Sequence, residues 1–490
     1  MTRRIVRTII QVATAAVFTL IVVFFLDRNF RVLPNAIHEY LPSHHAGLVI
    51  TDITITKCSS LNPFSSCALD AQVWHRIDKD LYLGMGTFSS AYVHVRRKKE
   101  EELTADDKVV IDVTVGRLDP EIAAAAAAAA GSKEDKGKTQ KRKAVEKGAR
   151  HERWESRPAG LWIKRSSKRW ASDSKSAVTA VDVLFGDDAV EAREGWAMVG
   201  GSTALLLDGG RKIPPAHITV RRGGKEQPPP KPTPRVNDNG RFKIMQLADL
   251  HLSTGVGKCR DALPLDWNGN HGGRCDADPR TLDFVAKILE EERPDLVVLS
   301  GDQVNGDTAP DAQTAIFKYA QLLIKHKVPY VSIFGNHDDE GSMSRAAQMD
   351  LIETLPYSLS RAGPHDIDGV GNYYVEVLAR GSSGHSALTV YLLDTHAYSP
   401  NERKFKGYDW IKPNQIEWFQ NTAQGLKKKH KEYTHVHMDV AFIHIPLPEY
   451  RDGNLTFVGE WKEPPTAPVY NSGFRDALVE EGVVMVSCGQ

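Results

Sequence analysis

The feature that most constrains the fold is a series of short apolar runs, each followed closely by Asp, His or Asn. The run Val328–Phe334 leads directly into Gly335–Glu340, with the sequence GNHDDE. Asp, His and Asn are poor strand formers, so their position at the end of an apolar run indicates a site rather than a core. For this segment alone, an ordinary Gly-Asn turn is an equally open interpretation.

Three more apolar runs end in the same way, and helix-like segments lie between them. Side chains at the carboxyl ends of parallel strands converge on one crevice of an open α/β sheet. Asp, Asn and His without nearby thiolates suit Zn, Fe or Mn better than a structural Cys-based zinc site. The runs and their polar ends are Ile244–Leu247 with Asp249 and His251, Leu296–Leu299 with Asp302 and Asn305, and Val440–Ile443 with His444.

The order D-x-H, GD, GNHD and an isolated His before Pro resembles the calcineurin-like metallophosphoesterases. The strings LADLHLS, LVVLSGDQVNGD, FGNHDDE, LLDTHAYS, FIHIPLPEY and YNSGFRDAL are most similar to one branch of that family. This branch holds the fungal dosage-dependent cell-cycle-regulator phosphatases and the plant purple-acid-phosphatase-like proteins. The resemblance covers roughly Phe242 to Gln490 and implies an α/β fold, a metallophosphoesterase-type two-sheet α/β sandwich with helices outside.

The resemblance also implies a reaction and a set of metal ligands. Two divalent or trivalent metal ions (Fe, Zn or Mn) would activate a water that hydrolyses phosphomonoesters, of phosphoproteins or of small molecules. By the family pattern, Asp302 bridges both metals, Asp249 and His251 bind the first, and Asn336 and His444 bind the second.

The remaining histidines are assigned different roles in this interpretation. His337 is implied as the catalytic histidine beside the phosphate, where it stabilises charge or protonates the leaving oxygen. His444 taken alone could equally be a packed core histidine. His396 of LLDTHAYS could support a ligand or cap a strand end, and we leave it out of the site.

Two positions depart from the family pattern. Asn305 stands where purple acid phosphatases carry a metal-binding Tyr, so no purple chromophore is expected. Gln490 stands where the first His of a GHxH motif would follow the VVMVSCG strand. We therefore expect a sandwich that is incomplete at its C-terminal end. Three hypotheses remain open: a two-metal phosphatase in truncated form, an inactive pseudophosphatase that acts as a binding module, and a non-enzymatic β-domain protein with a remnant C-terminal half.

An uncharged apolar segment, Thr8–Leu26, lies within residues 1–32. Nineteen helical residues span about 28 Å, close to the roughly 30 Å of a bilayer core. No A-x-A-like site follows it, so an uncleaved signal anchor is favoured over a cleaved signal peptide. Flanking arginines favour a cytosolic N-terminus and a lumenal or extracellular catalytic domain. A cytosolic active site stays open, because the fungal relatives imply phosphoprotein substrates in signalling.

The five cysteines agree with an oxidising compartment. Cys58 with Cys67, and Cys259 with Cys275, could each close a local disulfide, whereas Cys488 is left over. Free buried thiols are the alternative. The sequon at Asn454 is compatible with a glycoprotein.

Residues 38–222 predict a β-rich domain, with runs of Val, Ile and Thr at Leu48–Thr56, Ala91–Arg97, Lys108–Gly116, Ala177–Gly186 and His217–Arg222. An Ala-rich and basic insert at 121–160 is expected to be disordered or a solvated helix. A Pro-rich linker, 223–240, separates this domain from the phosphoesterase domain, 241–490.

Charge is balanced, with 62 Lys and Arg against 62 Asp and Glu, so no particular polyanionic partner is indicated. The basic insert alone allows a nucleic-acid interpretation, but neither a fold nor an aromatic pattern supports it. The expected partners are a phosphorylated substrate and the membrane, not nucleic acid.

Overall fold

The chain divides into two compact units in the computed structural model. The first contains Met1–Leu184 and Gly195–Gln227, and the second contains Phe185–Glu194 and Pro228–Gln490. The structure describes residues 3–34, 37, 47–59, 61–62, 64, 66–86, 88–131, 152–208, 213–224, 228–260, 262–263, 275–430, 437–460 and 465–490.

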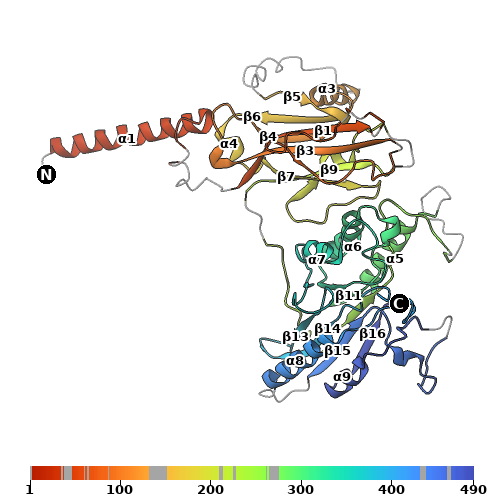
Figure 1. Cartoon of the computed structure of the whole chain (residues 1–490). Helices are drawn as coiled ribbons and strands as arrows, with labels where there is room; N and C mark the ends of the chain where they lie inside the picture. The colour runs from red at the N-terminus through yellow and green to blue at the C-terminus, as the bar shows by residue number, and fades with distance from the viewer. Residues whose placement is uncertain are drawn as a thin grey trace. The chain divides into compact units, whose positions relative to one another are not determined.

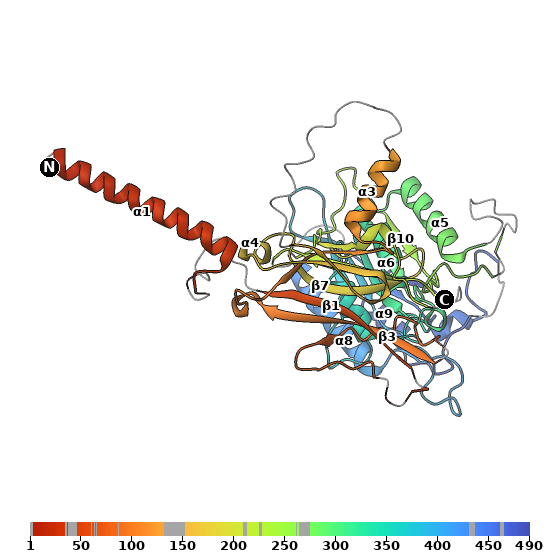
Figure 2. The same ribbon diagram turned by 90° about the horizontal axis from the view of Figure 1, so that it is seen from above.

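The first unit begins with helix α1, Arg3–Phe30. Its most apolar window has a mean hydropathy of 2.6, and the helix is long and apolar enough to cross a membrane. It extends away from the strands of its unit as one continuous helix (Figures 1 and 2). The helix confirms the apolar element at the N-terminus, because its 28 residues exceed what a bilayer core requires.

The strands of the first unit form three-stranded sheets with the orders β1-β3-β2, β4-β6-β5 and β7-β9-β8. Each of the five predicted strand segments coincides with one of these strands, because alternating Val, Ile and Thr suit a half-buried pleated surface. That they form a separate domain stays a prediction. The elements are β1 (Leu48–Ser59), β2 (His75–Arg76), β3 (Ser89–Lys99), β4 (Val109–Val115), α3 (Pro120–Gly131), β5 (Trp154–Ser156), β6 (Leu161–Ser166), α4 (Arg169–Ser172), β7 (Val178–Phe185), β8 (Trp196–Met198) and β9 (Ala216–Arg222).

The insert predicted at 121–160, as disordered or a solvated helix, is helical at its start and contains a short strand near its end. The alanine run forms helix α3, as expected from the high helix propensity of alanine. Trp154–Ser156 pairs with β6 as strand β5, because Trp154 lies opposite Lys164 in the antiparallel register. The basic part of the insert, residues 132–151, lies outside the described residues.

The second unit contains two sheets that pack face to face. Parallel strands in the order β10-β11-β12 form one sheet, and β13-β14-β15-β16 form the other, in which only the β13–β14 pair is antiparallel. The strands are β10 (Ile244–Leu247), β11 (Leu296–Ser300), β12 (Tyr330–Ile333), β13 (Tyr373–Leu378), β14 (Ser386–Leu392), β15 (Met438–Ile443) and β16 (Met485–Cys488).

One hydrophobic core lies between the two sheets. Val298 and Ile333 of the first sheet belong to the same buried cluster as Val390 and Phe442 of the second. Helices cover the outer faces: Phe419 of α8 and Phe474 of α9 share a second cluster with Tyr391 of β14. The helices are α5 (Ala277–Glu292), α6 (Ala312–His326), α7 (Arg345–Glu353), α8 (Pro413–His430) and α9 (Phe474–Glu480). This is the expected α/β sandwich (Figure 1).

The linker predicted at 223–240 stays a prediction, and residues of its second half contact the second unit. The unit boundary falls at 227/228, and the chain beyond it is bound to the edge of β13. Leu378 N–H donates to Pro234 O at 2.9 Å, and Val236 N–H donates to Leu378 O at 2.8 Å. Arg235 donates to Ala379 O at 2.6 Å. A Pro-rich composition therefore did not mean a free spacer here, because an edge strand offered it hydrogen-bond partners.

Both predicted disulfides are present. Cys58 bonds Cys67 in the first unit, and Cys259 bonds Cys275 in the second. Cys488 is a free thiol in β16. The second disulfide closes the insert between the D-x-H loop and helix α5.

Candidate metal centre

The loops after β10 and β11 run side by side because their backbones hydrogen-bond in register. Asp249 N–H donates to Gly301 O at 3.0 Å, His251 N–H to Asp302 O at 3.0 Å, and Leu252 N–H to Gln303 O at 2.9 Å. Parallel neighbouring strands deliver both loops to the same sheet edge. This backbone pairing places the D-x-H and GD motifs against each other.

Three of the predicted ligands have a left-handed backbone that non-glycine residues rarely adopt. The φ angles are 54° for Asp249, 47° for His251 and 52° for Asp302. Such conformations cost on the order of 1–3 kcal/mol each and persist only where the surroundings enforce them. Their concentration in two adjacent loops supports a site at this position.

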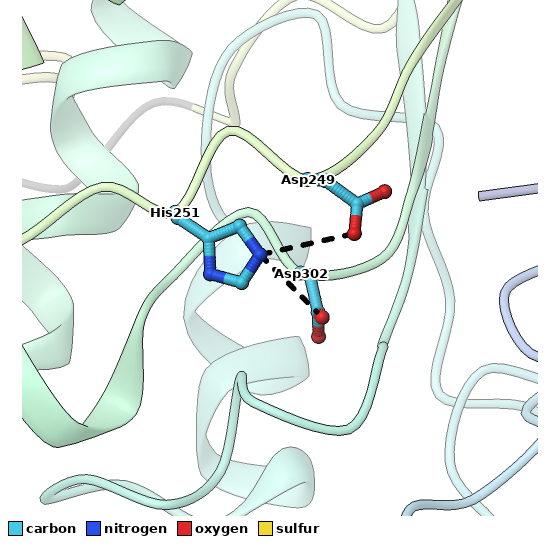
Figure 3. A group of neighbouring side chains, drawn as sticks. All are labelled: Asp249, His251 and Asp302. Atoms are coloured by element: carbon cyan, nitrogen blue, oxygen red, sulfur yellow. Dashed lines mark ion pairs between the residues drawn. The ribbon is translucent and has the colours of Figure 1, made fainter. Parts of the chain in front are cut away.

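The same three side chains converge. Ligand atoms of Asp249, His251 and Asp302 all lie within 4.8 Å of one another, and these residue types can hold a metal ion. Nε2 of His251 is 3.8 Å from Oδ1 of Asp249 and 3.7 Å from Oδ2 of Asp302. Figure 3 shows the imidazole facing both carboxylates. The spacing suits one ion between them more than direct hydrogen bonds, which would be shorter.

His444 approaches Asp302 from the second sheet. It follows β15, is fully buried, and places Nε2 at 3.4 Å from Oδ2 of Asp302. Its Nδ1 lies 2.9 Å from Ser300 O, so the Nδ1 proton is held by a backbone carbonyl. This arrangement leaves the Nε2 lone pair for a ligand, as is common for metal-binding histidines.

Two buried polar atoms at this site lack hydrogen-bond partners among the described residues. They are Oδ1 of Asn336 and Nε2 of His444. The amide nitrogen of Asn336 is already used, since it donates to Tyr398 Oη at 3.1 Å. Buried polar atoms without partners cost free energy, and a bound cation would satisfy both. The residues present therefore fit a metal.

The ionisation of the cluster follows from its charges. Asp249 and Asp302 raise the pKa of His251 although burial opposes them. Burial alone would lower the pKa of His444, but neighbouring Asp302 outweighs it and the pKa is raised. Burial alone would raise the pKa of Asp302, but His444, the His337 amide and His251 outweigh it and the pKa is lowered. Metal binding would require each imidazole to be unprotonated at the nitrogen that binds the ion.

Asp338 organises the site, and sequence reasoning missed it. Its Oδ2 accepts from the backbone N–H of Asp302 at 2.8 Å and of Gly335 at 2.6 Å. Its Oδ1 accepts from Val304 N–H at 2.9 Å. One buried carboxylate thus holds the GD loop and the GNHD loop together. The signal was the first acidic position of GNHDDE, which follows the two residues that we assigned to the site.

Two glycines are required by close approach. A Cβ on Gly335 would lie 2.2 Å from Oδ1 of Asp302, and one on Gly301 would lie 2.4 Å from Nδ1 of His444. Gly301 also has a φ of 101°. The GD and GN pairs are therefore steric requirements of the site, since any larger residue would displace a ligand.

His337 lies at the exposed side of the cluster. Its backbone N–H donates to Oδ1 of Asp302 at 2.8 Å, and its Nδ1 is 2.7 Å from Oε2 of Glu340. Its ring centroid is 5.3 Å from that of His251 and 6.4 Å from that of Tyr398. The Glu340 contact orients the imidazole with Nε2 on the opposite side of the ring. Neither Glu340 nor Tyr398 was singled out from the sequence, because nothing in the spacing marks them.

His396 does not join the cluster in the described contacts. Its Nε2 is 2.8 Å from Oε1 of Gln415, and its backbone N–H donates to Oδ1 of Asp394 at 2.9 Å. Asp394 in turn pairs with Arg345, which donates to Gly335 O at 2.6 Å. The LLDTH segment therefore supports the GNHD loop from behind, through Asp394 and Arg345.

Comparisons with known proteins agree with this geometry. Residues 242–473 match the family model described as calcineurin-like phosphoesterase. Phosphatase DCR2 of Saccharomyces cerevisiae is 36% identical over 331 residues, which are 64% of this chain and 54% of that protein. The chain thus spans about half the length of this relative.

Two plant relatives extend the comparison. Probable inactive purple acid phosphatase 29 of Arabidopsis thaliana is 35% identical over 51% of this chain and 66% of its own length. Probable inactive purple acid phosphatase 28 of the same plant is 31% identical over 55% of this chain and 69% of its own length. Since the match spans the segment that carries every predicted ligand, the chain belongs to the calcineurin-like phosphoesterase family.

Proposed function

We propose that this chain is a metal-dependent phosphomonoesterase with two metal ions bound around Asp302. The observation that carries the proposal is the position of a single oxygen. Oδ2 of Asp302 lies 3.7 Å from Nε2 of His251 and 3.4 Å from Nε2 of His444. A carboxylate between two imidazoles from different sheets is suited to bridge two cations. The yeast relative that carries the name phosphatase supports the same reaction class.

The proposed ligand sets are those that the family pattern implies. Asp249, His251 and Asp302 would hold one ion, and Asp302, Asn336 and His444 would hold the other. When bound, the ions would lower the pKa of a water and neutralise charge on the phosphoryl oxygens. The donor set of carboxylate, amide and imidazole favours Fe, Zn or Mn.

His337 is proposed as the residue that acts on the leaving group. The Glu340 carboxylate accepts a hydrogen bond from Nδ1–H of His337, which leaves Nε2 free on the opposite side of the ring. In the imidazolium form, Nε2–H can donate a proton to the departing oxygen. Its partial exposure leaves room for a substrate on that side.

The second candidate is an inactive binding module with the same fold. It is favoured by the plant relatives, whose names call them probably inactive. The expectation that the sandwich is incomplete at its C-terminal end stays a prediction. Both candidates require the fold, and they differ in turnover.

The test is metal content and turnover of p-nitrophenyl phosphate, measured on the full chain purified in detergent. We expect two bound metals and metal-dependent turnover. Asp302→Ala should abolish metal pairing and reduce turnover more than about a hundredfold, since even indirect support of a ligand is worth 10- to 100-fold. Asp307→Ala, an exposed position in the same loop, is the matched control. Unchanged metal content and activity in Asp302→Ala would remove the two-metal proposal. Metal binding without turnover of small or peptide phosphoesters would favour the binding module.

We also propose a single-pass membrane protein with both units on the lumenal or extracellular side. Helix α1, two disulfides and the exposed sequon residue Asn454 support this topology. Protease protection of intact vesicles and a mobility shift on glycosidase treatment should agree. Digestion from the cytosolic side, without glycan, would contradict the proposed orientation.

A further inference from the structure

A buried cluster of charged side chains joins the end of α1 to the rest of the first unit. Asp27 and Arg31 come from the helix end, and they are 1% and 8% exposed. They meet Glu100, Arg169 and Ser172, each at most 1% exposed. We infer that this charge clamp makes α1 a permanent part of the folded unit, so that the apolar segment is a retained lipid-bilayer anchor and not a removable leader. The inference depends on the proposed membrane insertion but not on the proposed phosphatase activity.

The first half of the clamp surrounds Leu33. Arg169 of α4 places Nε at 3.1 Å from Oδ2 of Asp27. Oδ1 of Asp27 accepts from the backbone N–H of Leu33 at 2.9 Å, and Arg169 Nη2 donates to the carbonyl of Leu33 at 3.0 Å. Asp27 and Arg169 therefore bind both backbone polar groups of Leu33, just after the helix.

The second half of the clamp uses the residue that ends the helix. Arg31 has a φ of 52°, and its N–H donates to Asp27 O at 2.9 Å. This left-handed turn directs its guanidinium into the unit. Nη2 donates to Oγ of Ser172 at 2.9 Å, and Nη1 lies 3.5 Å from Oε1 of Glu100. Ser172 in turn donates to Glu100 at 2.8 Å. Such a conformation is unfavourable for a non-glycine residue, and the contacts of the guanidinium help to stabilise it here.

The burial of these charges bears on whether the N-terminal segment can be cleaved off. Charges are buried in proteins only when they are paired, and removing one partner of a buried pair is strongly destabilising. Cleavage after Asp27 would take Asp27 from Arg169, and cleavage after Arg31 would also take Arg31 from Glu100. Cleavage directly after Leu26 would leave both residues in the chain, but it would place Phe24 and Leu26 where a cleavage site carries small residues. A signal peptide is cleaved before the mature fold is complete. Its last residues are therefore not expected to form buried ion pairs in that fold. The clamp begins at Asp27, the residue directly after the apolar run Thr8–Leu26.

The position of the clamp also fixes how close the first unit lies to lipid. Helix α1 is continuous from Arg3 to Phe30, and its rise is about 1.5 Å per residue. With the apolar run in the bilayer core, Asp27 would lie at its edge. The unit would be held at the membrane surface by a helix end without a flexible spacer.

The first measurement is the N-terminus of the mature chain. The full chain is expressed in eukaryotic cells, membranes are washed with alkaline carbonate, and the purified protein is analysed by peptide mass mapping. We expect peptides that contain Asp27 and Leu33 contiguous with the apolar run, in protein that stays with the membrane. A mature N-terminus beyond Leu26, or release of the protein by carbonate, would overturn the inference.

The second measurement tests the ion pairs themselves. Asp27→Asn and Arg169→Met should each lower the melting temperature of the full chain in detergent by about 10 °C and expose the first unit to protease. The double variant should recover most of the loss, because no unpaired charge remains in the core. Asn29→Ala is the control, since its side chain makes an exposed bond to Phe25 O on the same helix end.

The outcomes separate this inference from the proposed activity, because neither readout uses turnover. Single variants that melt like Asn29→Ala would show that the clamp does not hold the helix. A double variant as unstable as the sum of the single variants would show that the residues act independently. A coupled loss with a retained N-terminus would support the clamp even if the chain hydrolyses no phosphoester.

Discussion

Replacing Lys318 by Met should destabilise the second unit and weaken metal binding together. Lys318 lies on α6, and its side chain is 0% exposed. Its Nζ is 2.7 Å from Oδ2 of Asp278 and 2.6 Å from Oδ2 of Asp188. It also donates to Ser253 O at 2.9 Å and Gly255 O at 2.7 Å. These carbonyls belong to the loop that leaves the D-x-H motif.

The magnitude follows from the two carboxylates that the substitution leaves behind. Breaking a buried ion pair costs about 3–5 kcal/mol. For a domain of roughly 150–250 residues, 1 kcal/mol shifts the melting temperature by about 2–4 °C, so we expect a loss of roughly 10 °C. Loosening a loop that supports a ligand typically costs 10- to 100-fold in metal affinity. Lys325→Met on the exposed side of the same helix is the control.

The loss should depend on pH with a defined sign. Burial raises the pKa of Asp278, and Lys318 opposes that shift. Without Lys318 the pKa rises further, so the folded variant binds more protons than the unfolded chain above about pH 4. Its free energy of unfolding therefore falls as pH rises, and its deficit relative to the natural chain should be smaller at pH 5 than at pH 8.

Thermal melts and metal titrations of both variants at these two pH values test the reasoning. If Lys318→Met and Lys325→Met had the same melting temperature at pH 8, the role of the buried ion pairs would be refuted. A deficit that is larger at pH 5 than at pH 8 would refute the assigned sign.

Three further substitutions test how the site is supported. Asp338→Asn removes one of two acceptor oxygens that bind backbone amides, so we expect a loss of about 2–3 kcal/mol in chemical denaturation, and an unchanged midpoint would contradict this. Gly335→Ala brings a Cβ to 2.2 Å from Asp302 Oδ1, so metal content should fall while circular dichroism stays near normal; full metal occupancy would be inconsistent with the packing. Tyr398→Phe removes the acceptor for the Asn336 amide, so the affinity for the more weakly bound metal ion should fall about tenfold in a competition titration. An unchanged affinity would show that this hydrogen bond does not support the ligand.

Much of the second unit could be predicted because its signals are local. Short apolar runs before polar residues located β10, β11, β12 and β15, since parallel strands buried on both faces are almost continuously apolar. Strand β13 was missed, because Tyr373–Leu378 carries Glu376 and follows no recognised motif. The linker was assigned from composition alone, and composition does not reveal that an edge strand will bind it.

The sequence alone determined which residue types lie at the strand ends, and hence the ligands that we propose and the family. It could not determine that Asp338 holds two loops, that Lys318 joins a loop to α5, or that Asp27 is buried against Arg169. These contacts join residues 34 to 142 positions apart, and no local pattern encodes such distances. Polar residues become clamps only after folding brings them into a core where an unpaired charge is costly. The tertiary structure therefore decided how the site and the helix end are held.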